Sequence, residues 1–100
     1  MSLTGKQRRY LRGLAHHIDP VLMVGQSGVT SSVLEKTDFE LENHELIKVR
    51  VLDGAPMSAK EAGTELASGS RSELVQVIGR MAVLYRGRAK KPAIRLPKAD

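Results

Sequence analysis

The sequence predicts a single α/β domain, a two-layer sandwich with three helices and a mixed four-stranded sheet in the order α-β-α-β-α-β-β. A chain of 100 residues suits one hydrophobic core, because two cores would leave about fifty residues each, near the lower limit for independent folding. Three segments have apolar residues at helical spacing, and strand-like apolar runs lie between and after them. The last two of these runs flank a two-residue loop, which predicts an antiparallel hairpin.

Residues 4–18 are predicted to form the first helix. Thr4 can cap its start, with Gln7 as the partner in a capping box. Apolar residues at helical spacing make its buried stripe, namely Leu11, Leu14, Ala15 and Ile18. The basic residues of this segment fall on the opposite arc, and Asp19-Pro20 ends the helix.

Residues 21–24 form a short continuous apolar run, which is typical of a buried strand. A loop with two glycines follows, and then a helix from about residue 31 to 43. Several hydroxyl residues can cap this helix, and Ser32 fits a capping box with Glu35. The segment is therefore predicted to be a strand, a loop and a helix.

Residues 45–52 alternate at a period of two, which predicts a strand with one wet, basic face that carries Leu46, Lys48, Arg50 and Leu52. A turn follows, and Ser58 with Glu61 forms a capping box that opens the third helix. This helix runs to about Ser68, and its packing face consists of small residues, so it should lie close to the sheet. Gly69 is expected to cap its C-terminal end.

Leu74–Ile78 and Met81–Arg86 are the last two predicted strands, and a two-residue loop that begins with Gly79 suits a type II′ turn. This register pairs Val75 with Leu84 on the core face. The two strand–helix–strand units imply parallel pairing with right-handed crossovers, and the final hairpin makes the sheet mixed. Alternating polar residues indicate that one sheet face is only partly covered.

We predict one domain at residues 1–88 and a basic, flexible C-terminal tail at residues 89–100, in which residues 93–96 could add a short edge strand. The chain has no cysteine, which excludes disulfides, thiolate metal sites and cysteine nucleophiles. Its longest apolar runs fall far short of the ~18 residues of a membrane span. The first residues have no hydrophobic signal region, so we expect a cytoplasmic protein with no membrane partner.

Basic residues are concentrated at both ends of the chain. Residues 1–12 hold four and residues 80–98 hold seven, without an acidic residue in either segment, whereas residues 13–79 hold five basic and ten acidic residues. If the two ends meet beside the glycine loop, they form a positive pole of the kind that binds a phosphate backbone. The alternative is an ordinary solvated helix face and a floppy basic tail.

The motif Gly25-Gln26-Ser27-Gly28 lies between a predicted buried strand and a helix start. Glycines let the backbone approach a ligand closely, and the free amides at a helix start attract anions. The motif is therefore a candidate phosphate contact, although a simple turn is the commoner use of this spacing. It lacks the further residues of a P-loop or a dinucleotide site. Lys48 and Arg50 are likewise either solvated spacers on a strand or phosphate contacts.

Nothing in the sequence argues for catalysis or metal binding. His16, His17 and His44 do not have the spacing of a metal motif, and no Ser-His-Asp arrangement is evident. We therefore expect no catalytic residue, metal, cofactor or small-molecule substrate. Three aromatic residues are few for base stacking, so recognition of a nucleic acid should depend on backbone and shape.

Four blocks of sequence resemble the CRM domain, and more closely its bacterial single-domain YhbY-like members. The blocks are Leu3-Thr4-x-Lys6-Gln7-Arg8-x-x-Leu11-Arg12-x-Leu14-Ala15-His16, Val24-Gly25-x-x-Gly28-Val29-Thr30, His44-Glu45-Leu46-Ile47-Lys48-Val49-Arg50, and Val75-Gln76-Val77-Ile78-Gly79-Arg80 with Leu84-Tyr85-Arg86. The resemblance covers about residues 2–88. It implies a fold like that of the C-terminal domain of translation initiation factor three, in agreement with the elements above.

The resemblance also implies a non-enzymatic RNA-binding protein that associates with large-subunit ribosomal precursor RNA, or with the precursor particle, during ribosome assembly. It implies a KH-like GxxG loop and an adjacent basic surface as the RNA contact. The predicted RNA-binding residues are Gly25, Gln26, Ser27, Gly28, Lys48, Arg50, Arg80, Arg86, Arg8, Arg9 and Arg12. The alternative is a protein-interaction adaptor that docks through the second helix, where Phe39 lies off the apolar face, with incidental RNA binding.

Overall fold

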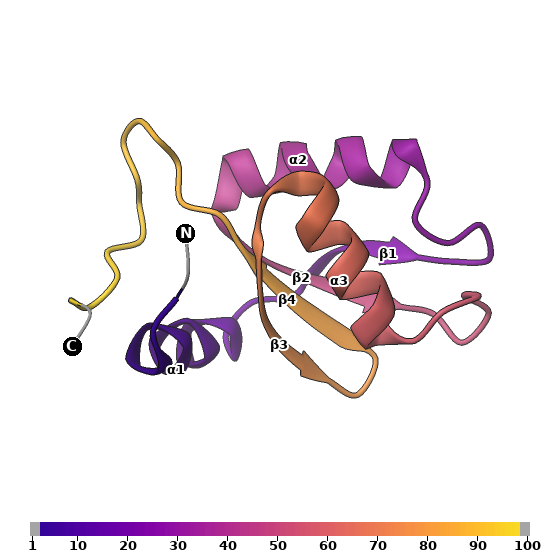
Figure 1. Ribbon diagram of the computed structural model, residues 1–100, viewed down its shortest axis with the longest axis horizontal. Coiled ribbons are helices and arrows are strands. Elements are labelled where there is room, and N and C mark those ends of the chain that lie inside the picture. The colour runs from indigo at the N-terminus through magenta and orange to yellow at the C-terminus, as the bar shows by residue number, and fades with distance from the viewer. Residues whose placement is uncertain (1–2, 99–100) are drawn as a thin grey trace.

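A computed structural model describes residues 3–98 of the chain as three helices and a mixed four-stranded sheet. The helices are α1 (Gly5–Ala15), α2 (Ser31–His44) and α3 (Ala59–Ser70), and the strands are β1 (Pro20–Val24), β2 (Leu46–Val51), β3 (Glu73–Ile78) and β4 (Met81–Tyr85) (Figure 1). The predicted fold class and order of elements are confirmed. Within the described residues, no helix is long and apolar enough to cross a membrane.

The strands lie in the order β1-β2-β4-β3. β1 and β2 pair in parallel, as expected for a strand–helix–strand unit, and β4 is antiparallel to both β2 and β3. β3 therefore runs in the same direction as β2 without pairing with it, because β4 of the final hairpin lies between them. Gly79 has a φ of +56°, as a type II′ turn requires at its first position.

The register of the hairpin differs from the prediction near the start of β3. Leu74 rather than Val75 lies opposite Leu84, because a β-bulge shifts the register between Leu74 and Gln76. Val75 therefore joins the opposite face of the sheet, where it is buried in the same cluster as Val83. The pairing of Val75 with Leu84 was wrong because alternation alone does not reveal where a strand holds an extra residue.

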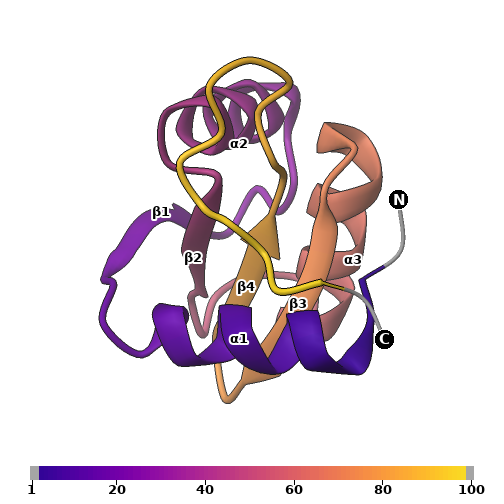
Figure 2. The same cartoon turned by 90° about the vertical axis from the view of Figure 1, so that its left-hand side faces the viewer.

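Helices cover the two faces of the sheet to different extents. α2 and α3 lie on one face, over a core that includes Leu22, Val24, Leu41, Ile47, Val49, Val51, Leu66 and Leu84. α1 runs across the strands on the other face (Figure 2), over a second cluster that includes Leu11, Leu46, Val75, Val83 and Tyr85. α1 covers this face only near the start of β2. The part toward the end of β2 stays open, in agreement with the predicted partly covered face.

The capping boxes that were predicted at the starts of α1 and α3 both form. Thr30, one of the hydroxyl residues that were predicted as caps, caps α2, and the predicted capping box of Ser32 with Glu35 was wrong. The Thr30 side chain accepts a hydrogen bond from the Val33 amide at 3.2 Å. Ser32 consequently lies inside the first turn.

Two glycines of α3 mark close contacts with neighbouring elements. Gly69 lies inside α3, and Arg71 rather than Gly69 provides the left-handed C-cap, with φ of +57°, so that prediction was wrong. A Cβ at Gly69 would lie 2.6 Å from a terminal methyl group of Leu34 on α2. A Cβ at Gly63 would lie 2.9 Å from Leu74 and 3.1 Å from the Cβ of Ala82. The predicted close approach of α3 to the sheet is thereby confirmed.

Gly63→Val should lower the free energy of unfolding by about 2–3 kcal/mol. The Leu74 side chain can rotate away from the new side chain, but the backbone fixes the Cβ of Ala82, so α3 must move away from the sheet. Urea unfolding followed by circular dichroism measures the effect. Gly13→Val is the matched control, because a Cβ at Gly13 in α1 would meet nothing within 4 Å. Equal stability of the two variants would contradict the close contact.

Residues 89–98 form no strand and lie against the domain. Ile94 and Leu96 pack on the cluster beneath α1, and the Gln7 side chain donates to the Pro97 carbonyl oxygen at 3.0 Å. The buried carboxylate of Glu45 accepts hydrogen bonds from three backbone amides, those of Arg88, Ala93 and Ile94, at 2.7–2.8 Å. The predicted domain boundary after residue 88 and the flexibility of the tail stay predictions.

Candidate nucleic-acid interface

The exposed part of the sheet beside α1 displays the two cations of β2. Strand alternation places Lys48 and Arg50 on the α1 face, while Val49 and Val51 point into the core on the other face. Arg50 is exposed and Lys48 is half-buried. The predicted basic strand face is therefore open to a ligand at Arg50 and borders α1 at Lys48.

Arginines of α1 border the same face. On one flank of the helix, Gln7 contacts the C-terminal segment, and Leu14 lines a pocket together with Ile94 of that segment. At 100° per residue, Arg8 and Arg12 fall on the other flank, on the side of the open sheet. Arg8 donates to the Leu74 carbonyl oxygen at 2.7 Å, and this contact holds the helix against the edge strand β3.

The GxxG loop lies at the end of the sheet where β1 stops. The Gly28 amide donates to the Gly25 carbonyl oxygen at 2.9 Å, so the four residues form a tight turn. Gly28 has φ of +69°, and a Cβ there would lie 3.1 Å from Met57 and 3.2 Å from Pro56. The second glycine is therefore required by the turn and by its packing on the loop after β2. Gln26 and Ser27 form the exposed tip.

Arg80 lies at the same end of the sheet as the GxxG loop. Its carbonyl oxygen accepts a hydrogen bond from the Val51 amide at 2.8 Å, next to the end of β2. Its guanidinium lies 2.6 Å from the carboxylate of Asp53, and both side chains are largely exposed. The hairpin loop, the loop after β2 and the end of β2 with Arg50 therefore adjoin one another.

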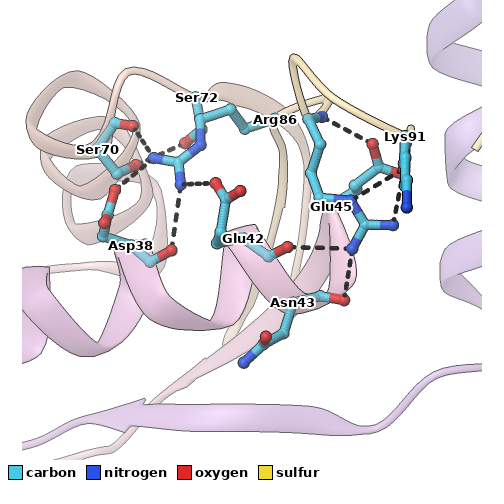
Figure 3. A network of polar contacts seen from close by, with 9 residues as sticks. Asp38, Glu42, Asn43, Glu45, Ser70, Ser72, Arg86 and Lys91 are labelled. Carbon is cyan, nitrogen blue, oxygen red and sulfur yellow. Dashed lines mark hydrogen bonds and ion pairs between the residues drawn. The ribbon is translucent and has the colours of Figure 1, made fainter. Parts of the chain in front are cut away.

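Arg86 is separate from these residues and has a structural role. Nη1 of Arg86 donates to the Asp38 carboxylate at 2.6 Å and to the Ser70 carbonyl oxygen at 2.7 Å. Its Nη2 lies 3.5 Å from the Glu42 carboxylate (Figure 3). Its side chain is 21 % exposed. The contacts join the end of β4 to α2 and to the end of α3. They turn Arg86 away from the open sheet face.

The two basic ends of the chain meet, but not beside the GxxG loop. α1 and the C-terminal segment lie together at one end of the molecule, and the loop between β1 and α2 lies at the other (Figure 1). β1 connects the two ends, so its length separates α1 from the GxxG loop. The expected single pole that includes the glycine loop was therefore wrong. Arg9, which is exposed on α1, belongs to the end that lacks the loop.

The three histidines lie at the C-terminal ends of α1 and α2. Across residues 3–98, no group of three or more histidine, aspartate or glutamate residues is placed to hold a metal ion. His44 lies 3.4 Å from Glu40, one turn earlier on α2. His16 and His17 are exposed at the end of α1.

The fold and this surface define a small α/β domain whose sheet is open and cationic between a basic helix and a glycine loop. Residues 3–86 match the CRS1 / YhbY (CRM) domain, and the chain belongs to this family. The predicted resemblance is thus confirmed.

Several relatives are similar over nearly their whole length. The chain is 43 % identical over 95 residues to "Probable RNA-binding protein YqeI" of Bacillus subtilis, and this match covers 95 % of the chain and 99 % of the relative. It is 40 % identical over 90 residues to "Probable RNA-binding protein PA4753" of Pseudomonas aeruginosa, covering 90 % and 86 %. The solution structure of protein SAV1595 from Staphylococcus aureus matches 96 % of this chain and 100 % of its own, with a TM-score of 0.81 and 49 % identity.

Proposed function

We propose that this chain is a non-enzymatic RNA-binding module. The names of its relatives support this function, and one structural observation carries it: Lys48 and Arg50 stand on an open sheet face. Two carboxylates near this face, those of Asp53 and Glu73, are each paired with an arginine. Such a surface attracts a phosphate backbone.

We further propose that the partner is large-subunit ribosomal precursor RNA, as the family resemblance implies, and that the protein acts in the cytoplasm. Lys48 and Arg50 are two residues apart on one strand, about 6.6 Å, so both can follow the same phosphate chain. Crosslinking of the protein to RNA in cells, followed by sequencing, tests the choice of RNA. Enrichment of precursor sequences that flank mature large-subunit RNA is the expected result, and enrichment of unrelated RNA would contradict it.

The adaptor function is supported by one observation, the 63 % exposure of Phe39 on α2. An adaptor would keep its protein partners after ribonuclease treatment of a purification, whereas an RNA-binding module would lose partners that are held through RNA. We expect the partners to be lost.

Replacement of both Gln26 and Ser27 by aspartate should weaken RNA binding by about tenfold at ~0.1 M salt, because two negative charges then face the phosphates at the loop tip. The tip is exposed, so the free energy of unfolding should change little. A gel-shift titration measures the affinity. Thr64→Asp with Ser68→Asp, two exposed positions on α3, is the control with the same change in net charge. An equal loss in the control would show a non-specific charge effect.

A further inference from the structure

A row of four side chains crosses the open sheet face. Met23 of β1 pairs with Arg50 of β2, Arg50 pairs with Met81 of β4, and Met81 pairs with Ile78 of β3. Paired residues on adjacent strands point to the same face of a sheet. The row therefore contains three apolar side chains and one arginine. We call these four residues the cross-strand row.

Three of the four side chains in the cross-strand row are exposed although the row is mostly apolar, and Met81 is half-buried. Met23 is 59 % exposed and Ile78 is 46 % exposed, while the chain neighbours of Met23, Leu22 and Val24, are buried in the core on the other face. α1 crosses the strands beside this row, where it packs on Val83 and Tyr85, and Val83 is two residues after Met81 on β4. Helix α1 therefore stops short of the cross-strand row.

Leu52 extends this apolar surface toward the GxxG loop. It continues the alternation of β2 on the face of Arg50, and it is 38 % exposed. A Cβ at Gly25 would lie 3.8 Å from a methyl group of Leu52, which is ordinary contact. The surface is therefore continuous from the edge strand β3 to the glycine loop.

Cations surround this apolar surface. Lys48 precedes Arg50 by two residues on the same face of β2, and Arg8 and Arg12 lie on the flank of α1 beyond Lys48. Arg80 stands at the end of the hairpin. A ligand that fits must combine negative charge with exposed, flat apolar groups. An unpaired nucleic-acid segment does so, because its bases are not hidden in a stack.

We propose that the cross-strand row binds the bases of an unpaired RNA segment while Arg50 and Lys48 hold the adjoining phosphates. This inference rests on the proposed function and specifies its ligand as single-stranded RNA. Methionine side chains are flexible and polarizable, so they can pack on bases of different shape without aromatic rings. The scarcity of aromatic residues, which predicted recognition by backbone and shape, does not exclude this contact.

Fluorescence anisotropy with the full chain tests the proposal on three RNA probes. The probes are a single strand of about ten nucleotides, the same strand with abasic sites at its centre, and its duplex. The wild-type protein should bind the intact strand about tenfold more tightly than the abasic strand, since bases then bury apolar area. It should also prefer the intact strand to the duplex at equal phosphate number.

Met23→Gln with Ile78→Thr should weaken binding of the intact strand by about tenfold and leave binding of the abasic strand unchanged. The slope of log affinity against log salt should stay the same, because no phosphate contact is lost. Val77→Thr is the matched control, because Val77 precedes Ile78 on β3, pairs with Ala82 and points to the face of α3. Circular dichroism and thermal unfolding verify that each variant is folded.

Equal affinity of the wild type for the intact and abasic strands would overturn the inference while leaving the proposed function in place. Failure to bind any of the three probes would overturn the proposed function itself. If the double variant instead converts a dimer to a monomer in sedimentation and keeps its RNA affinity, the cross-strand row is a self-association surface and the inference is wrong.

Discussion

Lys48→Glu with Arg50→Glu should weaken RNA binding by about a hundredfold at ~0.1 M salt. Each substitution removes a cation from the open sheet face and adds an anion in its place, so the phosphates meet a net change of four charges at the centre of the proposed interface. The fold should persist, because Arg50 is exposed and Lys48 is half-buried at the border of α1. A filter-binding titration measures the affinity.

The milder pair Lys48→Gln with Arg50→Gln separates phosphate contacts from general repulsion. If both cations contact phosphates of a single strand, the slope of log affinity against log salt should fall in magnitude by about 1.4, at about 0.7 for each contact. Lys36→Glu with Lys60→Glu, two exposed lysines on α2 and α3, is the control for net charge. A control that loses as much affinity as Lys48→Glu with Arg50→Glu would show that the open face is not the binding surface.

Glu45→Gln should lower the free energy of unfolding by about 2–3 kcal/mol at pH 7, because it breaks a buried, charge-assisted contact. One carboxylate oxygen accepts the amides of Ala93 and Ile94, and the other accepts the amide of Arg88. A glutamine side chain has an acceptor oxygen at only one of these two positions. Its NH₂ group would face a donor, so one backbone amide loses its partner inside the protein.

The same residue gives the stability a predictable dependence on pH. Burial raises the pKa of Glu45, but the hydrogen bonds from the three backbone amides and the charge of Arg88 lower it more, so its pKa lies below the usual value. The unfolded chain then binds the proton at a higher pH than the folded protein does. The contribution of the Glu45 carboxylate to the free energy of unfolding is therefore complete above the usual glutamate pKa of about 4.3. It is lost as the pH falls through the pKa of Glu45 in the folded protein.

Urea unfolding of the wild type and of Glu45→Gln between pH 7 and pH 3 measures this effect. The difference in free energy between them should shrink as the pH falls, because acid removes from the wild type the charge that the variant already lacks. Glu65→Gln, at an exposed position on α3, is the matched control. A difference between wild type and Glu45→Gln that is constant with pH would contradict the role of the carboxylate charge.

Local chemistry made much of the fold predictable. The capping boxes of α1 and α3 depend on residues three positions apart, and the strand at β2 follows from alternation over six residues. The errors concern contacts between distant segments. Glycine is typical of a helix end, but Gly69 lies inside α3, where it leaves room for the Leu34 side chain of α2. The bulge near Val75 is likewise set by pairing with β4.

The candidate site was predictable to the same extent. Alternation alone places Lys48 and Arg50 on a wet face. Met23 and Ile78 lie in apolar runs that are indistinguishable from core strands, and only the register across four strands shows that they surround Arg50. Arg86 has the same charge as Arg50, yet it forms ion pairs with the acidic side chains of Asp38 and Glu42 on α2. Charge by itself does not separate a ligand contact from a structural ion pair.

The position of β4 in the sheet determines when the sheet can fold during synthesis on the ribosome. β4 is the last of the four described strands to be synthesised, yet it lies in the interior of the sheet, between β2 and β3. A nascent chain that ends before β4 can pair β1 with β2, but it leaves the other edge of β2 without a neighbour. The four-stranded sheet can be completed only after residue 85 has left the exit tunnel, so all four strands must be synthesised before the sheet folds.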